Sequence, residues 1–315
     1  MMLLRWQYLL LLFCIVTVQI SAQPAEYDYM QYDKQGLDFD VKKFLEWTFD
    51  GTSVCRKGWG VLVGQWNGFD ISGIVGSTVD HGGYGFLMNT FDTALPLVPL
   101  VRYDQSFAAA IGKWMLNAAN ASRLFYPEHI PAKHQTIPEL AAATKGVIGY
   151  EGLVKESTFE KYKHIPAPVA QGDGPNWVPG ENPDVSQFSV YGSAHVGIFG
   201  SMIRQTDVEG ILQLDLLATD FFRDKAYPSY LIYNPYTDTR EVTISFPEAS
   251  GNTNLYDAVQ AGFIAARVGK TTRIKLLAGQ AAVIVAVPGD AKITREDRKL
   301  LADGIVIDYR FTGAE

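Results

Sequence analysis

The hydrophobic period of the chain changes near residue 206. Before that point apolar residues recur every three or four positions, as on one face of a helix. The clearest case is the stretch 104–125, which Asp104 can cap and whose apolar positions are Phe107, Ile111, Trp114, Met115 and Ala118. After residue 206 short apolar runs alternate with turn residues, which is typical of antiparallel strands. The pattern predicts an α+β multidomain chain, with helices first and an antiparallel β-sandwich second.

Three other stretches are predicted as helices: 40–50, the apolar stretch 86–101 and the small-residue stretch 191–206. The second is apolar almost throughout, and Pro96 and Pro99 predict that it bends or ends there. Because it is followed at once by the helix over 104–125, the two form a predicted helical hairpin. On the polar side of the second helix, Lys113, Asn117 and Asn120 share a face.

Two long segments show neither period. Residues 57–85 are rich in glycine and aromatic residues and predict a long loop with short extended pieces. Residues 127–190 are rich in proline, glycine and lysine and predict a surface loop or lid, with one helix over 137–143. Long loops of this kind are often functional.

The predicted strands are 211–222, 229–235, 240–247, 254–259, 262–268, 271–279 and 280–288, and the final residues can add another. Asp215 and Asp220 alternate with apolar residues in the first run, so we interpret them as its solvent-exposed face. A helix over 208–222 is the alternative interpretation of this run.

The first residues have the form of a secretory signal peptide, with Arg5, an apolar run over 8–18 and then Ser21-Ala22. Cleavage is expected after Ala22, and the location is then secreted or periplasmic. An uncleaved anchor is the alternative, but a membrane span needs about 20 apolar residues. The predicted organisation is a signal peptide over 1–22, a helical domain over 23–206 and a sandwich domain over 207–315.

Charge and cysteine content exclude several kinds of partner and cofactor. The formal net charge is −7 and no basic patch stands out, so nucleic acid is not an expected partner. Cys14 lies in the leader, which leaves Cys55 as a single thiol, and no Cys/His cluster has zinc-ligand spacing. We therefore expect no disulfide, metal or cofactor. The 16 Tyr and 6 Trp residues fill cores in most proteins, but their rings also stack on sugar faces.

Two stretches carry a resemblance to a known class. They are 82–127, "GGYGFLMNTFDTALPLVPLVRYDQSFAAAIGKWMLNAANASRLFYP", and the strand runs "SYLIYNPYTDTREVTISFP", "NLYDAVQAGF" and "IKLLAGQAAVIVAVP". Together they resemble secreted carbohydrate-active proteins of the (α/α)-toroid type, which include glycoside hydrolases and polysaccharide lyases with a C-terminal β-sandwich. The resemblance implies a carbohydrate ligand. The toroid is incomplete here, since the sequence predicts only about four or five helices, so a partner chain that completes the helical domain is a further expectation.

The stretch "VDHGGYG" is the first candidate site, because Asp80, His81 and Tyr84 flank two glycines just before an apolar helix. In a toroid, loops at the mouth of the helices line the substrate cleft. The aspartate can act as acid or base in hydrolysis, and the His/Tyr pair can remove a proton beside a uronate carboxylate. The plainer alternative is that Asp80 caps the helix and His81 bonds a backbone carbonyl.

Two further residues are catalytic candidates. Glu151 lies beside a tyrosine between glycines, and a solvated loop carboxylate is its alternative interpretation. His195 is a single ionisable ring on a helix of small residues, with Tyr191 near enough in sequence to orient it. Its alternative role is that of a core histidine with its hydrogen bonds satisfied.

Polar and aromatic loop residues are the candidates for substrate binding: Trp66, Asn67, Asp173, Asn176 and Trp177. Such residues suit sugar hydroxyls and ring stacking. A buried tryptophan and an Asx turn explain the same two loops equally well.

The predicted function is a secreted carbohydrate-active protein, most simply a glycoside hydrolase acting on a polysaccharide or oligosaccharide. An inverting hydrolase would need two carboxylates about 6.5–9.5 Å apart. The alternatives are a non-catalytic glycan-binding protein and a polysaccharide lyase that uses histidine and tyrosine.

Overall fold

The computed structural model describes residues 59–61, 65–66, 68–77, 84–136, 138, 146, 148–150, 152–154, 164–165, 169–171 and 190–311. The chain divides into two compact units. We call them the sheet unit, whose described residues are 95–109 and 202–311, and the helical unit, whose described residues lie within 59–94 and 110–201. The predicted signal peptide, the predicted helices over 40–50 and 137–143, and Cys55 lie outside the described residues.

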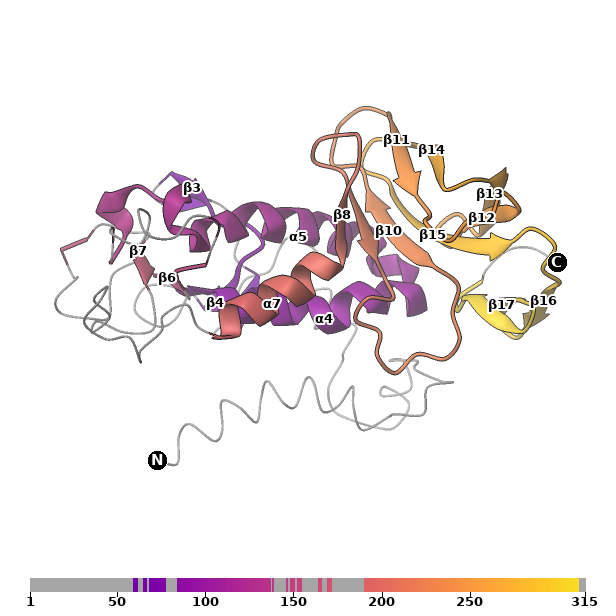
Figure 1. Cartoon of the computed structure of the whole chain (residues 1–315), viewed down its shortest axis with the longest axis horizontal. Coiled ribbons are helices and arrows are strands. Elements are labelled where there is room, and N and C mark those ends of the chain that lie inside the picture. The colour runs from indigo at the N-terminus through magenta and orange to yellow at the C-terminus, as the bar shows by residue number, and fades with distance from the viewer. Residues whose placement is uncertain are drawn as a thin grey trace. The chain divides into compact units, whose positions relative to one another are not determined.

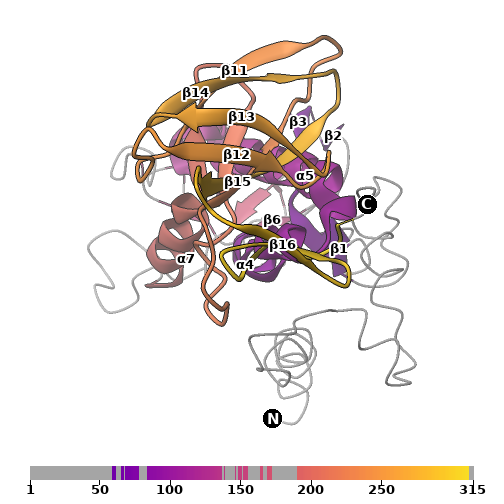
Figure 2. The ribbon, with the colours of Figure 1, turned by 90° about the vertical axis from the view of Figure 1, so that its right-hand side faces the viewer.

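The sheet unit contains two antiparallel sheets and a small third one (Figures 1 and 2). Six strands form the largest sheet, in the order β13-β12-β15-β10-β9-β8. Their bounds are β8 (Ile203–Gln205), β9 (Leu212–Asp215), β10 (Ser229–Tyr233), β12 (Thr253–Asp257), β13 (Gly262–Val268) and β15 (Ala281–Pro288). The second sheet pairs β11 (Arg240–Ser245) with β14 (Thr271–Leu276). The third is formed by β16 (Ile293–Glu296), β17 (Lys299–Ala302) and β18 (Ile305–Asp308).

The first two sheets share one hydrophobic core. Val242 and Ile244 of β11 are fully buried, and their neighbours along the strand are not, as alternation on a half-buried strand requires. They belong to one cluster with Leu255 of β12 and Ile284 of β15. The predicted antiparallel, sandwich-like region is thus confirmed, and the expected final strand is present as the β17–β18 hairpin.

The helical unit contains short strands as well as helices. A five-stranded antiparallel sheet has the order β1-β4-β5-β6-β7, and β2 and β3 form a separate pair. The bounds are β1 (Trp59–Val61), β2 (Gln65–Trp66), β3 (Phe69–Asp70), β4 (Val75–Ser77), β5 (Tyr84–Phe86), β6 (Gly152–Val154) and β7 (Val169–Gln171). The extended pieces predicted over 57–85 are confirmed. The interpretation of 127–190 as loop missed β6 and β7, because strands of three residues leave no alternation to detect.

Three α-helices lie in the described part of the chain: α4 (Leu87–Tyr103), α5 (Ala108–Ala121) and α7 (Val190–Ser201). Short 3₁₀ turns accompany them, namely η3 (Gln105–Phe107), η4 (Ser122–Phe125), η5 (Pro127–His129) and η6 (Ala132–His134). The first part of α4 belongs to the helical unit and the rest to the sheet unit. None of the described helices is both long and apolar enough to cross a membrane. The toroid arrangement stays a prediction.

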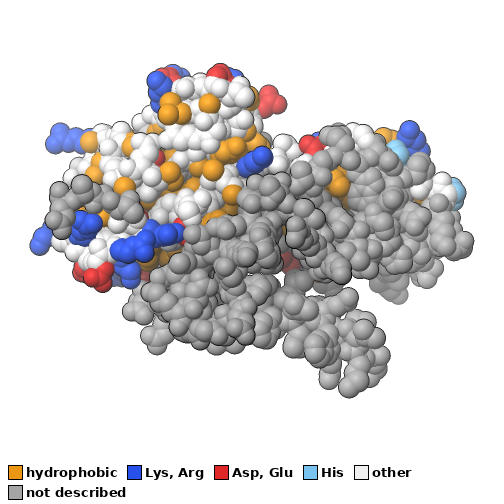
Figure 3. Space-filling view, turned by 180° about the vertical axis from the view of Figure 1, so that it is seen from behind, with side chains coloured by type: hydrophobic (Ala, Val, Ile, Leu, Met, Phe, Trp, Pro, Cys, Tyr) orange, Lys and Arg blue, Asp and Glu red, His pale blue; other side chains and the backbone are white. Residues whose placement is uncertain are grey.

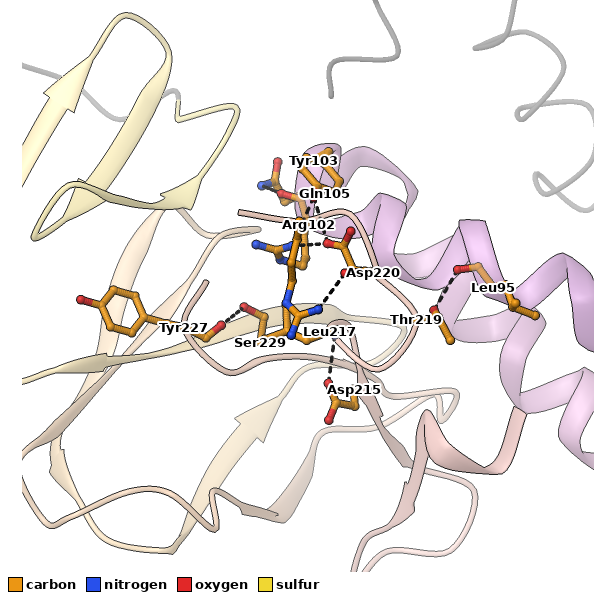
Figure 4. Close-up of polar contacts among 11 residues, drawn as sticks. Leu95, Arg102, Tyr103, Gln105, Asp215, Leu217, Thr219, Asp220, Tyr227 and Ser229 are labelled. Atoms are coloured by element: carbon orange, nitrogen blue, oxygen red, sulfur yellow. Dashed lines mark hydrogen bonds and ion pairs between the residues drawn. The ribbon is translucent and has the colours of Figure 1, made fainter. Parts of the chain in front are cut away.

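Helix α4 does not end at its prolines, since it runs past Pro96 and Pro99 to Tyr103. A proline has no N–H, so the carbonyl four residues earlier loses its partner within the helix. For Pro99 that carbonyl belongs to Leu95, and the Thr219 hydroxyl donates to it at 2.8 Å (Figure 4). The hydrogen bond removed by the proline is therefore replaced by a side chain 124 positions away.

The predicted capping and core positions of the second helix are confirmed. The Asp104 carboxylate accepts from the Ser106 N–H at 3.0 Å, although the turn it caps is η3. Trp114 is buried, and its indole N–H donates to the Gly73 carbonyl at 2.9 Å. Gly73 has φ +94°, and a Cβ there would lie 2.4 Å from the Ala118 nitrogen. Only glycine fits this close contact. Gly73 therefore allows its segment of the helical unit to pack directly against the backbone of α5.

Exposed large hydrophobic side chains in the described residues all belong to the sheet unit: Phe221, Phe222, Val259, Phe263, Ile264, Leu277 and Ile293. On the face shown in Figure 3, apolar side chains are scattered among charges of both signs. Among the residues of α4, α5 and α7 whose side chains the structure describes, none is an exposed large hydrophobic residue. A partner chain that completes the helical domain stays a prediction.

Candidate functional site

Of the predicted site residues, His195 is the one whose side chain the structure describes. Tyr84 lies in β5, where it pairs with Ser77 and Val154, and Trp66 lies in β2. Asp80, His81, Asn67, Glu151, Asp173, Asn176 and Trp177 lie outside the described residues, so their convergence around one hollow stays a prediction.

The alternative role of Asp80 as a helix cap is wrong. Strand β5 occupies Tyr84–Phe86, and α4 begins only at Leu87. A capping residue must immediately precede the first turn of its helix, and a strand separates Asp80 from that turn. The glycines therefore lead into the middle strand of the five-stranded sheet and not into a helix.

His195 forms a pair with a carboxylate that the sequence analysis did not single out. In the helical unit, its Nδ1 on α7 lies 2.7 Å from Oδ1 of Asp92 on α4. The exposed fraction of the side chain is 17% for His195 and 25% for Asp92. The pair is thus partly desolvated and still open to a ligand. The available signal was Asp92 itself, a lone acid within the otherwise uncharged first turns of α4.

Aromatic packing beside the pair holds the two helices in position. Phe91 precedes Asp92 on α4, and Phe199 lies four positions after His195 on α7. Their rings stack with centroids 4.5 Å apart at an interplanar angle of 24°, and both are buried. Stacked aromatic pairs contribute about 0.5–1.5 kcal/mol beyond their buried area. The relative position of the carboxylate and the imidazole is therefore set by the hydrophobic core.

The electrostatics of the pair depend on burial and charge. Burial raises the pKa of Asp92, while the charge and proximity of His195 lower it in part. Nδ1 is buried and forms no regular hydrogen bond, although Oδ1 of Asp92 lies 2.7 Å away, so the contact is an ion pair when the imidazole is protonated. Nε2 makes no hydrogen bond to any residue in the described part of the chain. One ring nitrogen faces a carboxylate, and the other can exchange a proton with a ligand.

A second charged pair lies in the sheet unit and is more deeply buried (Figure 4). Arg102 on the last turn of α4 pairs with Asp220, and the Tyr103 hydroxyl donates to the same carboxylate oxygen at 2.9 Å. The exposed fraction of the side chain is 5% for Arg102 and 12% for Asp220. The interpretation of Asp220 as a solvent-exposed strand residue is wrong, because β9 ends at Asp215 and the loop after it folds onto α4. Asp215 is partly exposed and pairs with Arg204 at 3.7 Å.

No group of His, Cys, Asp and Glu side chains in the described part of the chain could hold a metal ion. Comparison of the chain with models of protein families, with curated proteins and with solved structures gives no match. The Asp92–His195 pair is therefore the candidate functional site.

Proposed function

We propose that the protein is a secreted carbohydrate-active enzyme in which His195 is the acid–base residue and Asp92 positions and charges its ring. The observation that carries this proposal is the partly buried pair between Nδ1 and Asp92 Oδ1 at 2.7 Å. A carboxylate at one ring nitrogen stabilises the protonated imidazole, which is the state formed when the other nitrogen takes a proton. The predicted signal peptide supports the secreted location, and the toroid and sandwich resemblance supports the carbohydrate class.

The described pair favours elimination over hydrolysis. Hydrolysis needs two separate carboxylates across the bond that is cleaved, whereas here the carboxylate contacts the imidazole directly. A histidine can instead remove the proton beside the carboxylate of a uronate. The electron pair of that C–H bond forms the new C=C bond. The bond to the leaving sugar oxygen breaks, and that oxygen keeps the electron pair of the bond and takes up a proton. The products are a shortened chain and an unsaturated sugar.

The test is a polysaccharide panel that includes uronate polymers, read for both reducing ends and absorbance of unsaturated products. His195→Ala is expected to lower kcat about 10²–10⁴-fold, as loss of a general acid–base group does. Asp92→Asn is expected to lower activity about 10–100-fold, the usual effect of losing a positioning partner, and to change the pH profile of kcat. His164→Ala, an exposed histidine of the helical unit, is the matched control and keeps full activity.

Each readout separates the alternatives. Reducing ends without unsaturated product would replace elimination by hydrolysis, with Asp80, Glu151 and Asp173 as the carboxylates to mutate. Unsaturated product formed at the full rate by His195→Ala would overturn the assignment of the histidine. Binding of a panel member with no product at all would favour the glycan-binding alternative.

A further inference from the structure

A surface hollow of about 310 Å³ lies where α5 ends and the 3₁₀ turns η4 and η5 follow. It is lined by Ala119, Ser122, Arg123, Tyr126, Glu128, His129 and Gly146. All of these residues belong to the helical unit, and none belongs to the Asp92–His195 pair. Ligand pockets start at about 300 Å³, so the hollow has the size for a small ligand or for one unit of a polymer.

One wall of the hollow is fixed by a contact between two segments. Glu128 Oε1 accepts a hydrogen bond from the Gly146 N–H at 2.6 Å. Gly146 has φ +72°, a conformation that residues with a Cβ adopt at a cost. Glu128 Oε2 is buried and has no hydrogen-bond partner among the described residues. The carboxylate is thus held in place by one oxygen, and its other oxygen is enclosed by protein atoms.

The lining combines donors and acceptors with opposite charges. Arg123 and His129 are exposed and can donate from the rim, and Glu128 is a partly buried acceptor. Burial raises the pKa of Tyr126, and the nearby Glu128 raises it further, so the phenol stays a hydrogen-bond donor. The rings of Tyr126 and His129 meet edge-on at 6.3 Å and 71°. Arg123 and Glu128 offset each other in charge, which favours a neutral ligand with many hydroxyls over an ion.

We propose that this hollow binds one unit of a neutral oligosaccharide, as a subsite separate from the Asp92–His195 pair. Sugar hydroxyls both donate and accept, so they can use the Arg123 guanidinium, the His129 ring and the Tyr126 phenol at once, while the Glu128 carboxylate fixes the wall. The Tyr126 ring lines the hollow, and the face of an aromatic ring can pack on the C–H face of a pyranose ring. The inference rests on the proposed function only for its ligand being a carbohydrate. The neutral charge is argued from the lining alone, so the sugar unit bound here differs from the uronate on which His195 would act.

The experiment measures binding by isothermal titration calorimetry in the His195→Ala background, so that no probe is consumed. The neutral probes are cellohexaose, xylohexaose and mannohexaose, and the acidic probe is a galacturonate hexamer. The test variant carries Arg123→Ala and His129→Ala, and a second variant carries Glu128→Gln. The matched control carries Lys113→Ala and Lys133→Ala, two exposed cations that do not line the hollow.

At least one neutral probe is expected to bind, and the test variant is expected to weaken its affinity about tenfold or more. Glu128→Gln is expected to weaken it as well, and the lysine control to leave it unchanged. Equal thermal unfolding of all variants shows that the loss is one of contacts and not of folding. Unchanged affinity in the test variant, binding of the acidic probe alone, or no binding of any neutral probe would each overturn the subsite.

The failure of this inference is distinguishable from failure of the proposed function. If the wild-type protein forms product through His195 while the hollow variants bind as tightly as the control, the subsite is wrong and the enzyme assignment holds. If the wild-type protein forms no product but the test variant loses binding, the subsite holds without the enzyme.

Discussion

Each compact unit contains a carboxylate paired with a nitrogen-containing side chain. The two pairs differ in burial and in whether that side chain is an arginine or a histidine. In the sheet unit Arg102 and Asp220 are almost fully buried, and the Tyr103 hydroxyl shares the same carboxylate. In the helical unit Asp92 and His195 are partly exposed and have only each other among the described residues. A guanidinium stays protonated at any ordinary pH, whereas an imidazole gains and loses its proton easily.

The difference separates a structural pair from a chemical one. A buried arginine pair cannot exchange protons or reach a ligand, but removing one partner leaves an uncompensated charge in the core. A partly exposed histidine pair adds little to stability, but it can transfer a proton to a bound molecule. Mutations should therefore affect stability in the sheet unit and activity in the helical unit.

The largest expected effect is that of Asp220→Ala, which leaves Arg102 buried without its partner. We expect the free energy of unfolding to fall by about 3–5 kcal/mol, measured by urea denaturation. Asp238→Ala is the matched control, because the Arg240–Asp238 pair at 3.1 Å has side chains 38% and 60% exposed. That control should cost no more than about 1 kcal/mol. Equal losses in the two variants would contradict the structural role of Arg102–Asp220.

The contrast between the pairs also shows which structural features can be predicted from the sequence. The core spacing from Ile111 to Ala118, the cap at Asp104 and the β-rich region after residue 206 are predictable, because each is encoded by neighbours in sequence. The partner of Asp220 is not, since Arg102 lies 118 positions away.

The same limit applies to the candidate site. His195 stands out in sequence as a lone ionisable ring, but Asp92 on another helix becomes its partner only through the packing of Phe91 on Phe199. The strands β6 and β7 escape prediction for a similar reason. Each of these strands has only three residues, which is too short for an alternation of apolar and polar positions. They are stabilised by pairing, with β5 bonded to β6 and β6 bonded to β7.

A second prediction concerns a buried carboxylate in the sheet unit that forms no ion pair with any described residue. Burial raises the pKa of Asp257 from its ordinary value of 3.8 to about 6, although the N–H groups of Val259 and Val283 act in the opposite direction. The folded protein therefore binds this proton more tightly than the unfolded chain. The resulting stabilisation is complete below about pH 4 and is lost as the pH rises through about 6.

The loss should be at most about 3 kcal/mol between pH 4 and pH 7, from about 1.4 kcal/mol for each pKa unit. It is measured as the difference in urea unfolding free energy between the wild-type protein and Asp257→Asn at the two pH values. The comparison isolates Asp257, because other carboxylates titrate in both proteins. A difference that stays constant with pH would show that the folded carboxyl has no raised pKa.

The smallest effect on stability is expected at the Asp92–His195 pair, and it decides whether the contrast between the units is real. A double-mutant cycle with Asp92→Ala and His195→Ala should give a coupling free energy of about 0.2–1 kcal/mol, as for pairs that solvent reaches. Because the contact at 2.7 Å is not a regular hydrogen bond and attracts as an ion pair when His195 is protonated, the coupling should fall further in about 1 M salt, where the screening length is about 3 Å. A coupling of several kcal/mol that salt does not change would make the pair structural, like Arg102–Asp220, and would remove the physical basis for assigning proton transfer to His195.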